Sequence, residues 1–429
     1  MRLIVAAVAL CATACEAFTF VQPLRSTHTR APLKMTVGST DVAASTQAIA
    51  QQLEELTAML STLKSAKAAQ TAGVAPPDTA VAAPVAKIPP PVPHKKAKKD
   101  KDLPLVCASY EAPSPDFIYG ATMQQLEANP YWDQSGVPTN TFKPKEPYPG
   151  TILSVERLTG AKSPGEVCHV TIDHGGKLPY WEGQSLNVLP PGTDANGKPH
   201  KVRLYSIASS RYGDDGAGRT VTLCVRRALF TDPESGKQDP AKAGVCSNFL
   251  CDAAAGAAVS IAGPSGKIML MPEQDPTTDI IMVGTGTGVA PYRGFVRRLF
   301  QEDTPAARAY TGQAWLFLGV ANRDALLYHE DWLSVVRRFP FNFRYDVALS
   351  REQQNRAGGK MYIQDKMEEY ADELFDKLDN GAHIYFCGLK GMMPGINDML
   401  ARVARSKGLV WEDAFAALKK NGQWHVEVY

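Results

Sequence analysis

Motifs built on cysteine are missing from this chain of 429 residues. Its eight cysteines include no C-x-x-C pair and no run with histidine at a spacing that binds zinc, which excludes the common redox and zinc motifs. A disulfide framework is not expected in a chain of this length either. Free, mostly buried thiols are the default interpretation, and we expect no metal site.

A strong charge of one sign is equally absent. The formal net charge is +2, so the chain has no global basic field for nucleic acid, and an acidic partner would have to meet a local basic patch. Beyond the N-terminal residues, no segment is apolar enough to cross a membrane. The ordinary apolar and charged fractions indicate a globular protein, long enough for two or three domains.

Residues 1–35 are interpreted as a targeting peptide. Arg2 precedes an apolar run over 3–15 that is too short for a permanent membrane span, and small residues then precede Phe18. The stretch 18–35 carries three basic residues and no acid. This order resembles the two-part targeting peptides of algae with secondary plastids and predicts a plastid location, with a plain secretory signal as the alternative.

Residues 36–102 do not read as part of a catalytic domain. An apolar spacing of 4, 3, 4, 3 over 49–63 predicts a short amphipathic helix. An Ala/Pro-rich spacer follows over 70–93, and a basic run over 94–101. We interpret the segment either as a solvated linker or as a tether that docks on a membrane surface or a partner helix. Residues 103–136 are expected to form an irregular lead-in.

The remaining chain shows two different sequence patterns, one over 137–272 and the other over 273–429. Over 137–272, short β-branched runs at 151–155, 167–172, 185–188 and 220–225 alternate with Gly/Pro/Asp turns, which predicts an antiparallel barrel. Over 273–429 the pattern becomes strand, turn and helix, with strands expected at 279–283, 314–318 and 383–386. That alternation predicts a parallel sheet covered by helices on both faces. The expected fold class is therefore a two-domain α+β protein, a barrel followed by an α/β domain.

A glycine-rich turn at 284–288 (Gly-Thr-Gly-Thr-Gly) lies between the expected strand 279–283 and a helix that runs through Phe295 and Leu299. Glycines allow the backbone to approach a pyrophosphate, and the start of a helix supplies N–H groups and a favourable dipole. The spacing differs from G-x-G-x-x-G, so by itself the turn is a moderate indication of a dinucleotide site.

Two further clusters contain residue types suited to holding a cofactor. The run 203–209 begins with Arg203, which can grip a pyrophosphate, and continues with Tyr205 and Ser206, which can stack on a ring and donate a hydrogen bond. The residues 424–429 alternate in polarity as a strand does. They end with Glu427, Val428 and Tyr429, an aromatic end that we expect to pack against another group.

Together these residues resemble plant-type ferredoxin–NADP⁺ reductase. The resemblance covers roughly 137–429, and its motifs occur in the same order. They are FKPK (142–145), GKPHK (197–201), LCVRR (223–227), GVCSNFL (244–250), 263–272, SREQ (350–353), KMYIQ (360–364) and CGLKGM (387–392).

The resemblance implies an enzyme that binds FAD in the barrel and uses NADP(H). The residues implied for FAD are Arg203, Leu204, Tyr205, Ser206, Cys224, Val225, Arg226, Phe230, Val245, Cys246 and Ser247. Ser206, Cys387 and Glu427 would surround the reacting atoms of flavin and nicotinamide, positioning them while the cofactor carries the redox step. Tyr429 would stack on the flavin and move aside for the nicotinamide.

For NADP(H), the resemblance implies a second set of residues along the dinucleotide. They are Thr287, Val320, Ala321, Ser350, Arg351, Lys360, Tyr362, Gly388 and Leu389. A 2′-phosphate needs cations and hydroxyls, and Arg351 can fork onto it while Lys360 adds a point charge. The sequence departs from the family pattern at 321–324 (Ala-Asn-Arg-Asp), where Arg323 offers another cation, and at Phe230, where the family often has tyrosine.

The implied partner is an acidic ferredoxin, with flavodoxin as a further candidate. Steering would come from a cluster of lysines on the surface, at positions 143, 145, 198, 201, 419 and 420. The implied reaction carries electrons from two reduced ferredoxins through FAD to NADP⁺ in photosynthesis. The alternatives are flow from NADPH to ferredoxin, a broad flavin reductase, and a module that docks on a thylakoid or antenna complex through 36–102.

Overall fold

The structure is a computed structural model, and it describes residues 126–429. The predicted targeting peptide, the helix and linker over 36–102 and most of the lead-in over 103–136 lie outside the described residues. In the described part of the chain, no helix is long and apolar enough to cross a membrane.

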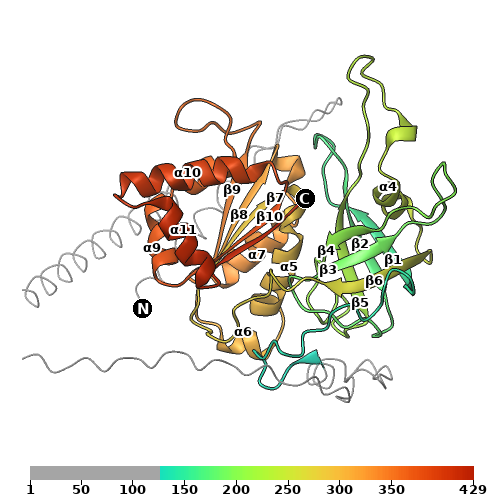
Figure 1. Ribbon diagram of the computed structural model, residues 1–429, viewed down its shortest axis with the longest axis horizontal. Helices are drawn as coiled ribbons and strands as arrows, with labels where there is room; N and C mark the ends of the chain where they lie inside the picture. The colour runs from blue at the N-terminus through green and yellow to red at the C-terminus, as the bar shows by residue number, and fades with distance from the viewer. Residues whose placement is uncertain (1–125) are drawn as a thin grey trace, which may run out of the picture. The chain divides into compact units, whose positions relative to one another are not determined.

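Six antiparallel strands form the barrel, in the order β4-β3-β6-β1-β2-β5 (Figure 1). Their bounds are β1 Tyr148–Arg157, β2 Val167–Asp173, β3 Ser185–Leu189, β4 Arg203–Ser206, β5 Thr220–Arg226 and β6 Ala258–Ser265. The outer strands meet where Ile207, just after β4, forms a bridge with Leu223 of β5. This contact closes the sheet and confirms the predicted barrel, including the four runs of β-branched residues.

The barrel interior is filled by inward-facing apolar side chains. Ile152, Val170 and Ile172 are fully buried there. One open end is covered by α4 (Val245–Asp252), which directs Leu250 and Cys251 into the same cluster. A helix start is thereby fixed on the barrel, next to strand β5.

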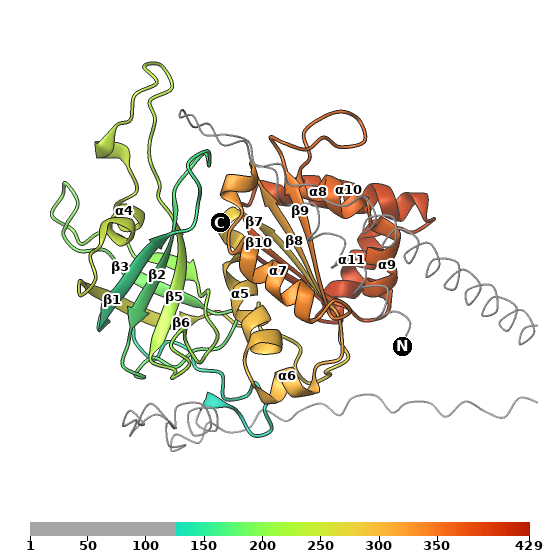
Figure 2. The same cartoon turned by 180° about the vertical axis from the view of Figure 1, so that it is seen from behind.

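Five parallel strands form the second sheet, in the order β11-β10-β7-β8-β9. They are β7 Ile280–Thr285, β8 Ala314–Val320, β9 Phe343–Leu349, β10 His383–Gly388 and β11 Trp424–Val428. The three predicted strands 279–283, 314–318 and 383–386 correspond to β7, β8 and β10. Figures 1 and 2 show helices on both faces of this sheet, as the alternating pattern predicts.

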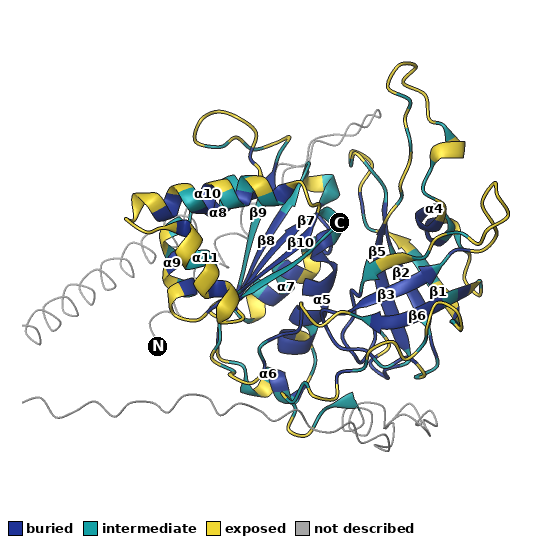
Figure 3. Ribbon diagram, in the orientation of Figure 1, coloured by how far each residue is buried: buried dark blue, intermediate teal, exposed yellow. Residues whose placement is uncertain are grey.

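Successive residues of the central strands point to opposite faces of the parallel sheet, and each face has its own apolar cluster. In β7, Ile280 and Met282 belong to one cluster, whereas Ile281 and Val283 belong to the other. Figure 3 shows these strands as almost continuously buried. The covering helices are α5 Ala290–Val296, α6 Pro305–Ala309, α7 His329–Arg338, α8 Ile363–Glu368, α9 Ala371–Asp379, α10 Met392–Ser406 and α11 Trp411–Lys420.

Helix α5 continues into a π-helical turn, Arg297–Gln301, so the helix predicted through Leu299 is a helix with a widened last turn. This helix faces the barrel. Arg293 donates to Ala208 O at 2.9 Å, and a Cβ at Gly294 would lie 2.9 Å from Ser209 O. The absence of a side chain at Gly294 lets the helix approach the barrel closely.

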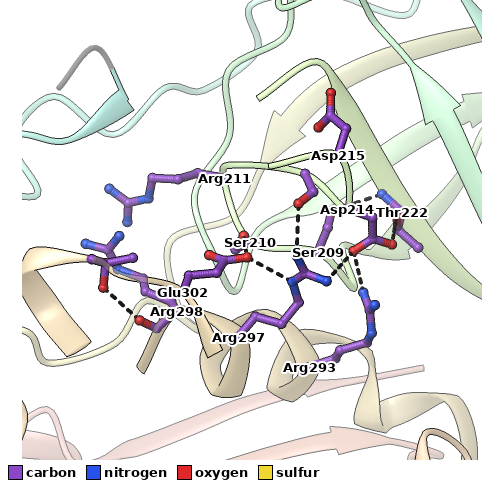
Figure 4. Close-up of polar contacts among 12 residues, drawn as sticks. Ser209, Ser210, Arg211, Asp214, Asp215, Thr222, Arg293, Arg297, Arg298 and Glu302 are labelled. Carbon is purple, nitrogen blue, oxygen red and sulfur yellow. Dashed lines mark hydrogen bonds and ion pairs between the residues drawn. The ribbon is translucent and has the colours of Figure 1, made fainter. Parts of the chain in front are cut away.

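A buried network of charges joins the barrel to α5 and its π-turn (Figure 4). Arg293 and Arg297 both pair with Asp214, at 2.8 and 3.0 Å, and His169 reaches the other oxygen of this carboxylate at 3.0 Å. Burial opposes the charge on Asp214, but His169 and the two arginines together hold its pKa well below the ordinary value. The Asp214 carboxylate therefore bridges strand β2 of the barrel and helix α5.

Arg298 is the centre of a second buried network. Its side chain is fully buried and pairs with Glu127 at 2.6 Å and with Glu273, while Glu182 lies 3.8 Å away. Glu182 also pairs with Arg211 at 2.8 Å. Burial alone would raise the pKa of Glu182, yet Arg211 and Arg298 hold it below the ordinary value. Glu127 and Glu182 remain charged because each has guanidinium partners that lower its pKa.

Candidate functional site

A cavity of about 840 Å³ lies where the barrel meets the carboxyl ends of β7 and β8. This is the edge at which open parallel sheets bind ligands. Predicted residues that line it are Arg226, Thr287, Val320, Ala321, Ser350, Tyr362, Leu389 and Tyr429. The cavity thus brings together residues that the sequence places more than two hundred positions apart.

The glycine-rich turn forms one wall of this cavity. It runs from Thr285 at the end of β7 into a 3₁₀ turn, Gly286–Val289. Gly286 has φ +54° and open space where a Cβ would stand, whereas a Cβ at Gly288 would lie 2.0 Å from Cys387 O. The turn therefore packs directly against β10, and its backbone remains open to the cavity.

Four polar side chains converge where the two sheets meet. Cys387 and Glu427 are paired on the parallel strands β10 and β11, and Ser185 and Ser206 are paired on β3 and β4. Ser185 donates to Glu427 at 2.6 Å, and the Ser206 hydroxyl lies 3.8 Å from the Cys387 sulfur. Three residues predicted from the sequence, Ser206, Cys387 and Glu427, are therefore neighbours.

Burial shifts the protonation of this cluster. It raises the pKa of the fully buried Cys387 thiol to about 12, and Glu427 adds to the rise. It also raises the pKa of Glu427, against the hydrogen bond from Ser185. The thiol of Cys387 is consequently neutral near pH 7.

Tyr429 lies at the mouth of the cavity with 60% of its surface exposed. Its hydroxyl is 2.5 Å from that of Thr287 in the glycine-rich turn, and its backbone N–H donates to Gly388 O at 3.0 Å. The backbone is thus fixed by the sheet, whereas the ring is more than half exposed and makes a hydroxyl contact with Thr287. Such a ring can swing without disturbing β11.

The barrel face beside this cluster fits FAD. Leu204 on β4 and Val245 at the start of α4 expose 58% and 49% of their surfaces, an apolar surface that a flat ring system can cover. Arg203 is exposed, and within residues 126–429 its guanidinium donates only to the adjacent Val202 O, at 3.2 Å. The first N–H groups of α4 are not used within the helix and have no side-chain cap. A cation and a helix start therefore lie beside an apolar surface.

The other residues implied for FAD surround this face at different depths. Tyr205 and Phe230 are half-buried, Cys246 is buried, and Ser247 accepts from Ala228 N–H at 3.1 Å. Cys224 and Val225 are buried in β5, so only their backbone is available to a ligand.

At the far side of the cavity, Ser350 and Tyr362 line the wall, and Arg351 and Lys360 are exposed on the same segment. The Ser350 and Arg351 N–H groups donate to Val320 O and Ala321 O at 3.0 and 2.8 Å. Backbone bonds thus hold the hydroxyl and cation beside the end of β8. This set has the composition expected to bind a phosphate.

Two contributors are not recognisable in the sequence. Ser185, which holds Glu427, reads as an ordinary residue of a barrel strand. The loop 159–165 lines the cavity through Thr159, Ser163, Pro164 and Gly165, although nothing in its composition indicates a ligand. Ser185 and loop 159–165 contribute to the site through contacts with residues far away in the sequence, so no local sequence pattern reveals them.

A barrel with an exposed apolar face, joined to a parallel sheet whose glycine-rich turn borders a cavity, defines a flavin- and nucleotide-dependent oxidoreductase. Residues 282–398 match the family model described as "Oxidoreductase NAD-binding domain".

Curated relatives indicate which family of flavin- and nucleotide-dependent oxidoreductases the chain resembles. The chain is 64% identical over 294 residues to the chloroplastic root isozyme of ferredoxin–NADP reductase from Oryza sativa subsp. japonica, covering 68% of this chain and 78% of the relative. It is 62% identical over 331 residues to root isozyme 1 of Arabidopsis thaliana, covering 77% and 86%. The chloroplastic enzyme of Chlamydomonas reinhardtii is 58% identical over 300 residues, covering 69% and 84%.

A solved structure of the same enzyme family is also similar to this chain. Ferredoxin–NADP⁺ reductase from Plasmodium falciparum with 2′P-AMP aligns with a TM-score of 0.54 and 26% identity, over 68% of this chain and 99% of that one. The chain belongs to the ferredoxin–NADP reductase family. It is therefore a flavoprotein oxidoreductase that uses FAD and NADP(H), and the chloroplastic names of its relatives support the predicted plastid location.

Proposed function

We propose that this protein transfers electrons between ferredoxin and NADP(H), running toward NADPH in photosynthetic plastids. The observation that carries the proposal is the position of β11. This strand brings Glu427 against the barrel serine Ser185, and it places Tyr429 at the cavity bordered by the glycine-rich turn. A flavin on the barrel face and a nicotinamide in the cavity would meet at this strand.

When bound, FAD supplies the redox chemistry, exchanging single electrons with an iron–sulfur protein and a hydride with NADP(H). The protein positions the reactants. Arg203 and the start of α4 would hold the FAD pyrophosphate, and Leu204 would contribute apolar surface to the barrel face. Ser206, Cys387 and Glu427 would border the reacting atoms, and Tyr429 would make room for the nicotinamide by breaking its contact with Thr287.

The adenosine end of NADP(H) is assigned to Ser350, Arg351, Lys360 and Tyr362. Support comes from the exposed cations beside a cavity wall and from the relative that was solved with 2′P-AMP. Arg323 takes no direct part in this proposal. Its guanidinium lies 3.7 Å from Glu352 and its side chain is 83% exposed.

The partner surface is assigned to exposed lysines of both domains. They are Lys143, Lys145, Lys198, Lys201, Lys419 and Lys420. Flavodoxin, also acidic, is proposed as a second partner for the same surface. Docking of residues 36–102 on a thylakoid or antenna complex, a secondary plastid, the targeting peptide 1–35 and the division after residue 272 remain predictions from the sequence.

The test compares NADPH with NADH as donor for ferredoxin reduction by the FAD-loaded protein. We expect a strong preference for NADPH. In Arg351→Ala the KM for NADPH should rise about tenfold to a hundredfold, as expected for loss of a charge-assisted hydrogen bond, with little change for NADH. Arg308→Ala, which removes an exposed arginine that pairs with Asp303, is the control. Equal use of the two donors by the unaltered protein would contradict the proposal.

A further inference from the structure

The barrel and the α/β domain also meet beside the cavity, through hydrogen bonds that are separate from the arginine networks. Asp324 accepts from Lys162 N–H at 2.7 Å through its carboxylate and from Gly160 N–H at 2.8 Å through its carbonyl. Asn322 donates its amide to Lys162 O at 2.7 Å. We call these three bonds between loop 159–165 and segment 322–324 the interdomain clip.

The clip depends on close approach at Gly160. A Cβ at this position would lie 2.5 Å from Asp324 Oδ2 and 2.8 Å from its Cγ, so any other residue would displace the carboxylate. The loop is also fixed from its own side, because Arg157 donates to Thr159 O at 2.9 Å and Val167 N–H donates to the Thr159 hydroxyl at 3.2 Å. The clip is therefore a contact between two ordered segments.

Both halves of the clip border the cavity. Loop 159–165 contributes four of its residues to the lining, and Ala321 and Ala325 flank the other half. Segment 322–324 follows directly on Val320 and Ala321, whose carbonyls hold the N–H groups of Ser350 and Arg351. The clip thus ties the barrel to the stretch of backbone that positions the proposed phosphate-binding residues.

We infer that the interdomain clip holds the two cavity walls together around the adenosine end of NADP(H) and sets how fast the nucleotide leaves. Asp324 and Asn322 are then positioning residues: they fix the cavity wall that holds Ser350 and Arg351 and do not touch the nucleotide themselves. The inference rests on the proposed nucleotide site. The segment 321–324, where the sequence departs from the usual family pattern, gains a physical role that needs no contact with the nucleotide.

The test measures the dissociation constant and the release rate of NADP⁺ with the full-length, FAD-loaded protein, by calorimetry and by stopped-flow displacement. Asp324→Ala and Gly160→Ala should each weaken binding about tenfold, mainly through faster release, as loss of the hydrogen bond to Lys162 N–H predicts. Asp324→Asn keeps an acceptor oxygen for Lys162 N–H and should stay within about twofold. Asp303→Ala, which removes the same charge from an exposed loop, should match the unaltered protein.

Arg351→Ala separates this inference from the assignment of the site. If Arg351→Ala weakens NADP⁺ binding and neither clip variant does, the clip has no role in retention and the inference is wrong. If neither Arg351→Ala nor the clip variants change binding, the nucleotide site itself is misassigned. Loss of FAD, or a lowered melting temperature in both clip variants with an unchanged NADP⁺ release rate, would make the clip a purely structural contact and overturn the inference.

Discussion

At the scale of single residues, the sulfur of Cys387 is close to the proposed reacting atoms and yet shielded. The side chain is fully buried, and burial raises the pKa of its thiol to about 12. Because the thiolate is the reactive form, alkylation should be very slow. We expect iodoacetamide at about pH 8 to leave Cys387 unmodified in the native protein and to modify it after denaturation. Peptide mass mapping measures the labelling of Cys387. Fast labelling in the native protein would show that strand β10 opens to solvent.

Glu427 illustrates a conflict between stability and function. Its pKa is raised above 4.5 by burial, so the native state binds its proton more tightly than the unfolded state does. Stability contributed by this group is therefore greatest at low pH and declines as the pH rises. Glu427→Gln should be at least as stable as the unaltered protein at pH 7, with the difference vanishing below the ordinary pKa. Its turnover should fall roughly tenfold or more, since the group positions reactants.

Thermal unfolding at several pH values, together with steady-state turnover, tests this prediction. Glu156→Gln removes an exposed carboxylate and is the control for the charge itself. A Glu427→Gln variant that is clearly less stable at pH 7, or one with full turnover, would contradict the assigned role.

The site residues differ in how far the sequence reveals them. Residues with a constrained chemical task, such as Arg203, Glu427 and Tyr429, stand in recognisable motifs. The structure places Tyr429 at the cavity and Glu427 against Ser185 of the barrel. Asp324 and Gly160 have a role only because they contact each other in the interdomain clip. They are 164 positions apart, from 160 to 324, so no local sequence pattern links them. Pairings made by tertiary packing are invisible to local patterns.

At the scale of elements, the π-turn Arg297–Gln301 supplies arginines to both networks of ion pairs. Arg298 compensates Glu127 and Glu273 in a dry interior. Arg298→Met would leave Glu273 buried without an ion-pair partner and Glu127 with only the more distant Arg211, at 3.6 Å. We expect it to lower the free energy of unfolding by about 3–5 kcal/mol. Arg308→Met removes an exposed pair and should cost under about 1 kcal/mol.

Denaturant titration of both variants measures the difference. Glu273 pairs only with Arg298 among the ion pairs of residues 126–429, so adding Glu273→Gln to Arg298→Met should recover part of the loss. Equal stability of Arg298→Met and Arg308→Met would show that water reaches this network.

Elements with a clear local pattern were predictable, and those without one were not, whatever their length. The β-branched runs predict β1, β2, β3 and β5, and the strand–turn–helix pattern predicts β7 and its glycine-rich turn. Strand β6 (Ala258–Ser265) alternates only over Val259–Ile261 and ends in Gly-Pro-Ser, yet the barrel buries it between β3 and β1. Tertiary pairing overrides weak local propensity there.

At the scale of the whole molecule, a net charge of +2 leaves steering to local clusters. We expect kcat/KM for ferredoxin to fall on the order of tenfold between low and physiological ionic strength. Replacing Lys419 and Lys420 with glutamine should flatten this dependence, whereas Lys237→Gln, at an exposed lysine outside the proposed surface, should not. A rate for ferredoxin that is independent of salt would argue against an electrostatic partner surface.

The strand order has a consequence for how the protein is made. The barrel is complete once Ser265 has been synthesised, whereas β7 lies between β8 and β10 and needs a partner formed at His383–Gly388. Domains fold as units during synthesis, N-terminal first. On the ribosome, the finished barrel therefore precedes an α/β half whose central strand keeps one open, apolar edge for about a hundred residues of further synthesis. That half is the part of the nascent chain that chaperones have to shield.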